Sequence, residues 1–145
     1  GINFKGCDAE ADQRFFIRQI KDIIKAQSID LIIIAGDIFD RSVAGVEAIR
    51  LYDEAISDIC GTLKCKAAII AGNHDGAERL AQCRRLLADS GLYLCGSLTK
   101  EPIIIREDNA EIFLLPWIST DKVRAVYPDK AEEIDSLVKY TFFCL

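Results

Sequence analysis

The sequence predicts an α/β domain in which short parallel strands alternate with helices. Two apolar runs support this prediction: residues 31–35 and 67–71 are rich in isoleucine and alanine, and glycine follows each run directly. An apolar run of this length that stops at glycine indicates a strand buried on both faces of a sheet. A helical pattern separates the runs, which makes them a β-α-β unit with parallel strands. Ligands of open parallel sheets gather beyond the carboxyl ends of the strands, so we expect the functional site at that edge.

The composition is that of one folded domain or part of one. The chain has 145 residues, half of them hydrophobic, which is enough for a core. No apolar run approaches the roughly 18 residues of a membrane span, so no membrane partner is expected. The net charge of −5 disfavours a broad basic face for nucleic acid, but it still allows DNA held through metal ions or a partner. The six cysteines are scattered without a C-x-x-C pair, which indicates free thiols in a reducing, cytoplasmic setting.

The two ends of the sequence indicate a piece of a longer protein. The chain begins at Gly1, contains no methionine, and ends on the apolar residues 142–145 without a polar finish. No linker or composition shift divides it. We therefore expect one partial domain over residues 1–145.

Helical spacing of apolar residues follows on both sides of the first strand. One helix is expected over residues 10–26 and a second over residues 43–60, with Ser42 as the cap of the second. The basic residues of the first helix, among them Arg14 and Lys21, are interpreted as a solvated surface rather than a DNA contact. The apolar residues expected to face inward are Phe16, Ile20, Ile23 and Ile24 in the first helix and Val46, Ile49, Ile56 and Ile59 in the second.

The second half of the chain combines one more helix and strand with an antiparallel hairpin. The expected elements are a helix over 77–89 that buries Leu80, Cys83, Leu86 and Leu87, a strand over 92–95, hairpin strands over 102–106 and 111–115, a helix over 120–126 and a last helix from residue 130 onward. The hairpin would add a second layer of strands to the parallel sheet.

Polar residues follow both strands at the point where each apolar run stops. Asp37 comes after the first strand, and Asn73, His74 and Asp75 come after the second. Glycine before each group lets the backbone turn sharply, so the side chains should converge. Oxygen and imidazole ligands suit manganese, iron, zinc or magnesium, and two such ions can clamp a phosphate and activate a water. His74 is the candidate general acid, and Asp75 is expected to fix its tautomer.

Each of these residues also has an ordinary structural explanation. Asp37 could cap a turn, Asn73 and Asp75 are common turn residues, and a single histidine is often structural. A structural explanation does not require polar motifs at the ends of two neighbouring strands. Their pairing therefore favours a functional edge.

The motifs at the strand ends resemble those of a known superfamily. Residues 36–41 (Gly-Asp-Ile-Phe-Asp-Arg) and 72–75 (Gly-Asn-His-Asp) are similar to the second and third motifs of calcineurin-like metallophosphoesterases. Within that superfamily, the chain resembles the SbcD-type nuclease subunits over essentially its whole length. The further matches lie at residues 12–14, 35–41, 47–48, 51–52 and 113–116.

The resemblance implies a fold, an activity and partners. The fold would be a metallophosphoesterase-like β-sandwich flanked by helices, in α-β-β-α layers, of which this chain holds a part. The activity would be that of a two-metal DNA nuclease, a double-strand exonuclease and single-strand endonuclease in DNA repair and recombination, with two divalent metal ions, expected to be Mn²⁺. The implied partners are a DNA substrate, an SbcC-like ATPase subunit and a second copy in a homodimer.

The resemblance also assigns roles to residues of this chain. Asp37 would bridge the two metal ions and Asn73 would bind one of them. His74 would act on the scissile phosphate or the leaving oxygen, and Asp75 would orient His74. Asp40, together with the arginine that follows it, would support the loop rather than bind metal.

The chain departs from the family pattern in its histidines. The family begins with a strand that ends in Asp-x-His and carries later histidine motifs, whereas His74 is the one histidine here. We therefore expect this chain alone to bind metal poorly and to cleave little or nothing. Two alternatives stay open: another calcineurin-like phosphoesterase, such as a phosphatase or nucleotide phosphodiesterase, and a non-catalytic scaffold of the same fold.

Overall fold

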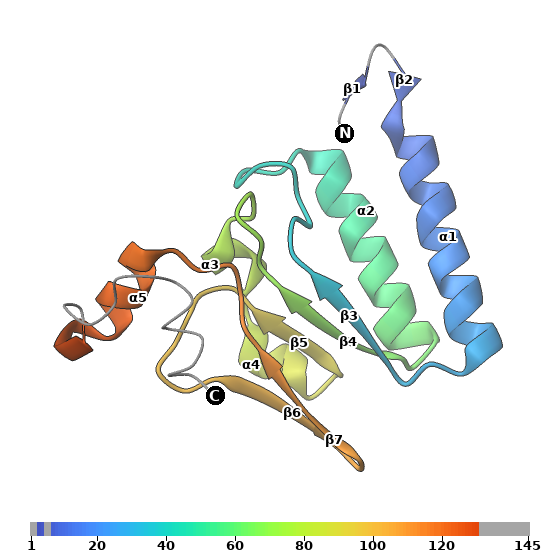
Figure 1. The fold of residues 1–145 in the computed structure, drawn as a ribbon. Coiled ribbons are helices and arrows are strands. Elements are labelled where there is room, and N and C mark those ends of the chain that lie inside the picture. The colour runs from blue at the N-terminus through green and yellow to red at the C-terminus, as the bar shows by residue number, and fades with distance from the viewer. Residues whose placement is uncertain (1–2, 5–6, 131–145) are drawn as a thin grey trace.

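The computed structural model of the chain describes residues 3–4 and 7–130, and its centre is a parallel sheet (Figure 1). The sheet has three strands in the order β3 (Leu31–Ala35), β4 (Lys66–Ile70) and β5 (Leu92–Cys95). Ile33 lies opposite Ala68, and Ala68 lies opposite Tyr93. All the side chains of the middle strand are buried or half-buried, as expected for a parallel strand covered on both faces. The predicted parallel β-α-β unit is confirmed.

Helices cover one face of this sheet. They are α1 (Ala9–Gln27), α2 (Val46–Ile56), the π-helical turn η1 (Ser57–Thr62) and α3 (Ala77–Leu80). Ile24 of α1 and Ile59 of η1 pack in one core with Ile69 of β4. Two ion pairs also join α1 to its neighbours, because Arg14 lies 2.8 Å from Glu54 and Lys21 lies 2.7 Å from Asp58.

An antiparallel hairpin covers the other face. Its strands are β6 (Ile103–Glu107) and β7 (Ala110–Leu114), and Ile105 lies opposite Ile112. Ile105 and Leu114 pack against Ala68 and Cys95 of the parallel sheet. The two layers of strands, with helices outside one of them, form part of the expected β-sandwich.

The remaining elements lie around these layers. They are β1 (Asn3–Phe4), β2 (Cys7–Asp8), α4 (Arg84–Ala88), α5 (Thr120–Val126) and the short 3₁₀ turn η2 (Pro128–Lys130). The expected helix over 120–126 is confirmed, and the helix expected from residue 130 onward lies outside the described residues apart from its first residue. In the described part of the chain, no helix combines the length and apolarity that a bilayer crossing requires.

The second helix begins later than predicted. Its cap is Gly45, without a side-chain hydrogen bond, so Ser42 is not the cap. Val46 and Ile49 were expected inward but are 63% and 49% exposed. The reason is that the start of α2 extends past the ends of the strands, so that only its later turns reach the sheet (Figure 1).

Two further predictions about helices are wrong in part. The helix expected over 77–89 is divided into α3 and α4 by Cys83, whose φ of 56° cannot continue a right-handed helix. As a result Leu86 is 73% exposed, whereas Leu80 is buried as expected. On α1, Ile24 faces the core, but Phe16 and Ile23 are 61% and 53% exposed because the described residues place nothing over that side of the helix.

Candidate functional site

The candidate site lies at the carboxyl ends of β3 and β4, where two loops meet. The loop after β3 carries Asp37, and the loop after β4 carries Asn73 and His74, all three exposed to solvent. The backbone N–H of His74 donates to Oδ1 of Asp37 at 3.2 Å. Parallel pairing of the strands thus brings together residues that are far apart in the sequence, as expected for this edge.

Two glycines allow the loops to touch. A Cβ atom on Gly36, whose φ is +82°, would lie 3.0 Å from Cα of Gly72. A Cβ atom on Gly72 would overlap both the backbone nitrogen and the carboxylate of Asp37. Asp37 itself adopts a left-handed φ of 50°, which aspartate tolerates better than most residues. The close approach of the two backbones therefore determines where the Asp37 carboxylate lies.

The imidazole of His74 is held by a backbone group. Its Nδ1 lies 2.9 Å from the carbonyl oxygen of Asp40. A carbonyl oxygen only accepts, so Nδ1 must carry the hydrogen and Nε2 is left for proton transfer. The carboxylate of Asp40 pairs with Arg41 at 3.0 Å, and this guanidinium lowers the pKa of Asp40.

Asp75 does not orient His74 as predicted. Its carboxylate accepts from three backbone N–H groups: those of Ile38 at 3.2 Å, Phe39 at 2.9 Å and Gly72 at 2.8 Å. Both of its oxygens are used, and its side chain is buried. The expected role of Asp75 toward His74 is taken by the Asp40 carbonyl, a main-chain atom that has no signature in a sequence.

Residues outside the motifs support the two loops. The ring of Phe39 packs on that of Tyr52 in α2, with centroids 5.5 Å apart. Burial is the main reason that the pKa of Tyr52 rises to about 12, so its hydroxyl stays neutral. Arg79 of α3 donates to the carbonyl of Ser42 at 3.0 Å, which ties α3 to the end of the first loop. Arg79 was not expected at the site, and helical spacing alone would not have revealed it.

The residues at this edge fit part of a divalent metal site. Asp37 offers a carboxylate and Asn73 an amide oxygen, both hard donors that such ions prefer. However, within residues 3–4 and 7–130 no three His, Cys, Asp or Glu side chains are grouped so that they could hold a metal ion. A catalytic ion takes at least three protein ligands or bound substrate groups, so this chain supplies an incomplete set.

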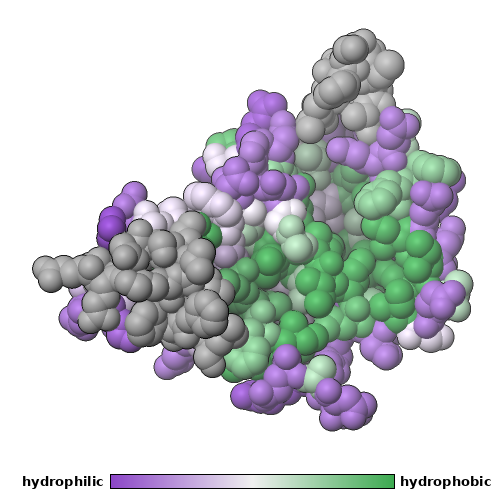
Figure 2. Space-filling view, viewed as in Figure 1, coloured by the Kyte–Doolittle hydropathy of each residue, from purple (hydrophilic) through white to green (hydrophobic). Residues whose placement is uncertain are grey.

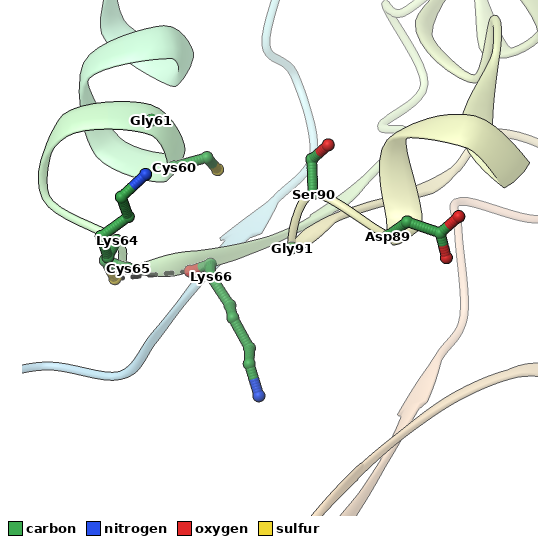
Figure 3. Close-up of a pocket in the computed structure, with 8 residues that line it drawn as sticks. All are labelled: Cys60, Gly61, Lys64, Cys65, Lys66, Asp89, Ser90 and Gly91. Atoms are coloured by element: carbon green, nitrogen blue, oxygen red, sulfur yellow. Dashed lines mark hydrogen bonds between the residues drawn. The ribbon is translucent and has the colours of Figure 1, made fainter.

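The pocket shown in Figure 3 lies at the opposite end of the sheet. This open hollow of about 540 Å³ is lined by residues before and at the starts of β4 and β5: Cys60, Gly61, Lys64, Cys65, Lys66, Asp89, Ser90 and Gly91. Lys66 points away from the other side chains (Figure 3) and pairs with Glu107 at 2.8 Å. The pocket holds none of the residues predicted to act together, so the functional site is not there.

Comparisons with known proteins agree with this geometry. Residues 9–144 match the family model of calcineurin-like phosphoesterases. The chain is 34% identical over 122 residues to the SbcD subunit of nuclease SbcCD from Staphylococcus epidermidis, which covers 84% of this chain and 33% of that protein. It is 31% identical over 137 residues to the corresponding protein of Bacillus subtilis, covering 92% of this chain and 35% of that protein. The chain thus spans about a third of the length of these relatives. The predicted resemblance is confirmed: the chain belongs to the calcineurin-like phosphoesterase family.

Proposed function

We propose that this chain is part of a metal-dependent DNA nuclease subunit that hydrolyses phosphodiester bonds. The observation that carries the proposal is the meeting of Asp37 with the Asn73–His74 loop at one edge of the sheet. Family membership makes the reaction a phosphoester hydrolysis. The names of the relatives, nuclease subunits from several bacteria, favour a nucleic-acid substrate over a small phosphate ester.

Each residue of the edge has a proposed role. Asp37 and Asn73 hold divalent metal ions, proposed to be two Mn²⁺, together with ligands from other parts of the full-length protein. Such ions, when bound, polarise a phosphate and generate a nucleophilic water. His74 acts as general acid: Nε2, when protonated, donates to the leaving oxygen, while the Asp40 carbonyl keeps the ring in place through Nδ1.

The setting of the full-length protein is part of the proposal. It acts on DNA in repair and recombination, with an SbcC-like ATPase as partner and a second copy in a homodimer. Residues 1–145 form a single partial domain of it and are inactive alone. The thiols of Cys60, Cys65, Cys83 and Cys95 are unpaired, which supports a reducing, cytoplasmic location.

The test is DNA cleavage by the full-length protein. Wild type, Asp37→Ala and His74→Ala are incubated with linear duplex DNA and Mn²⁺, and released nucleotides are measured. We expect each variant to lose at least about 100-fold in rate, as removal of a metal ligand or proton donor does elsewhere. Asp89→Ala, which removes a carboxylate at the opposite end of the sheet, is the matched control and should cut like wild type.

Other outcomes would select the alternatives. If none of the proteins cuts DNA while wild type hydrolyses a small chromogenic phosphodiester, the nuclease assignment is wrong and a phosphatase or nucleotide phosphodiesterase takes its place. If neither substrate is hydrolysed and calorimetry detects no bound Mn²⁺, the protein is a scaffold of the same fold.

A further inference from the structure

We propose that Asp75 is a positioning residue: its carboxylate fixes the Asp37 loop against the Asn73–His74 loop without itself touching metal or substrate. The inference rests on the proposed function for its catalytic consequence, but its structural part stands on the hydrogen bonds alone. Asp75 is 8% exposed and is the one charged residue that is buried among the residues whose burial the structure describes. A buried carboxylate is retained only where it is fully hydrogen-bonded, so its partners indicate its purpose.

The partners of Asp75 belong to both loops. Two of the three N–H donors, Ile38 and Phe39, directly follow Asp37 in the first loop. The third donor, Gly72, directly precedes Asn73 in the second loop. Hydrogen bonds to a charged acceptor are about twice as strong as neutral ones, so this carboxylate is a firm link between the loops.

A second hydrogen bond runs between the same loops in the opposite sense. Asp75 of the second loop accepts from the first loop, and Asp37 of the first loop accepts from the N–H of His74 at 3.2 Å. Only the Asp75 link is buried; Asp37 and His74 are exposed. The buried carboxylate therefore sets the spacing, which leaves the exposed carboxylate available for a ligand.

The chemistry of the link requires a carboxylate. An asparagine of the same shape has a single acceptor oxygen, and its NH₂ group would face an N–H donor. Asp75→Asn therefore loses part of the link while leaving Asp37, Asn73 and His74 in the chain. The ring of Phe39 is also held from α2 by Tyr52, so the first loop retains one of its supports in this variant.

The experiment compares Asp75→Asn with wild type and with Asp89→Asn in the full-length protein. Amide hydrogen exchange is measured at Ile38, Phe39 and Gly72, Mn²⁺ affinity by calorimetry, and DNA cleavage by kcat and KM. We expect exchange at those amides to accelerate at least about tenfold and Mn²⁺ affinity to fall about 10- to 100-fold, as when outer groups that orient ligands are removed. The value of kcat should fall while KM for DNA changes by less than about twofold, because Asp75 does not contact DNA. Asp89→Asn should match wild type in all three measurements.

The outcomes separate this inference from the proposed function. Exchange rates and Mn²⁺ affinity at wild-type values in a folded Asp75→Asn protein would overturn it, and so would a loss of thermal stability alone. If wild type binds no Mn²⁺ and cuts nothing, the proposed function fails, but faster exchange at the three amides still supports Asp75 as the link between the loops. Should Asp75→Asn fail to fold, Tyr52→Leu replaces it: faster exchange at Phe39 supports the inference, and wild-type exchange there contradicts it.

Discussion

Gly72 lies where the two loops of the candidate site come closest. A methyl group at this position would overlap the backbone nitrogen of Asp37 as well as its carboxylate, so rotation of a side chain cannot relieve the contact. We predict that Gly72→Ala lowers the free energy of unfolding by roughly 1–3 kcal/mol, the usual cost of overfilling a packed position. It should also displace Asp37 and reduce DNA cleavage by the full-length protein. Urea unfolding and the nuclease assay measure the two effects.

Gly61 provides a matched control for this substitution. A Cβ atom there would meet no other atom within 4 Å. Gly61→Ala should therefore leave cleavage unchanged and keep stability within about 1 kcal/mol of wild type. Equal loss in both variants would show that the contact between the loops is not what makes Gly72 necessary.

At the scale of single elements, the hairpin of β6 and β7 holds the second face of the sheet. Ile105 is 2% exposed and packs with Leu114 against Cys95, whereas Ile104 points to the other side of the hairpin and is only half-buried. We predict that Ile105→Ala lowers the free energy of unfolding by about 2–5 kcal/mol, from lost burial and the cavity left behind. Ile104→Ala should lower it by about 1 kcal/mol or less. Urea denaturation of both variants measures the difference, and similar losses would mean that the hairpin does not cover the core.

Strands could be predicted more reliably than helix boundaries, for a physical reason. The strands β3, β4 and β5 are continuous apolar runs because a parallel strand is buried on both faces, and such runs are visible in the sequence. The break at Cys83 depends on a left-handed backbone conformation, which no spacing of apolar residues reveals. The same holds at the site: the sequence indicated that Asp37 and His74 would share an edge, but the partners of Asp75 are backbone amides and carry no side-chain pattern.

At the scale of the whole molecule, the chain spans about a third of its relatives and leaves apolar surface uncovered. Apolar residues gather over a broad area of the face seen in Figure 2, over the sheet and toward the helices. Ile33 of β3 is 53% exposed, and Phe16 and Ile23 of α1 are 61% and 53% exposed. Among the described residues, β3 pairs with β4 alone, so its other edge has no strand beside it. A free strand edge beside apolar side chains is a template for association.

We therefore predict that a polypeptide of these 145 residues binds a hydrophobic dye and self-associates. Ile33→Thr should reduce both effects, because it removes apolar surface from the uncovered strand while keeping a β-branched side chain that suits a strand. Leu86→Thr is the matched control: Leu86 is 73% exposed but lies on α4, away from β3, so this change should leave association unaltered. Dye fluorescence and analytical ultracentrifugation across a concentration series measure the two effects. A monomer that binds no dye would show that the surface at β3 and α1 is covered within this chain itself.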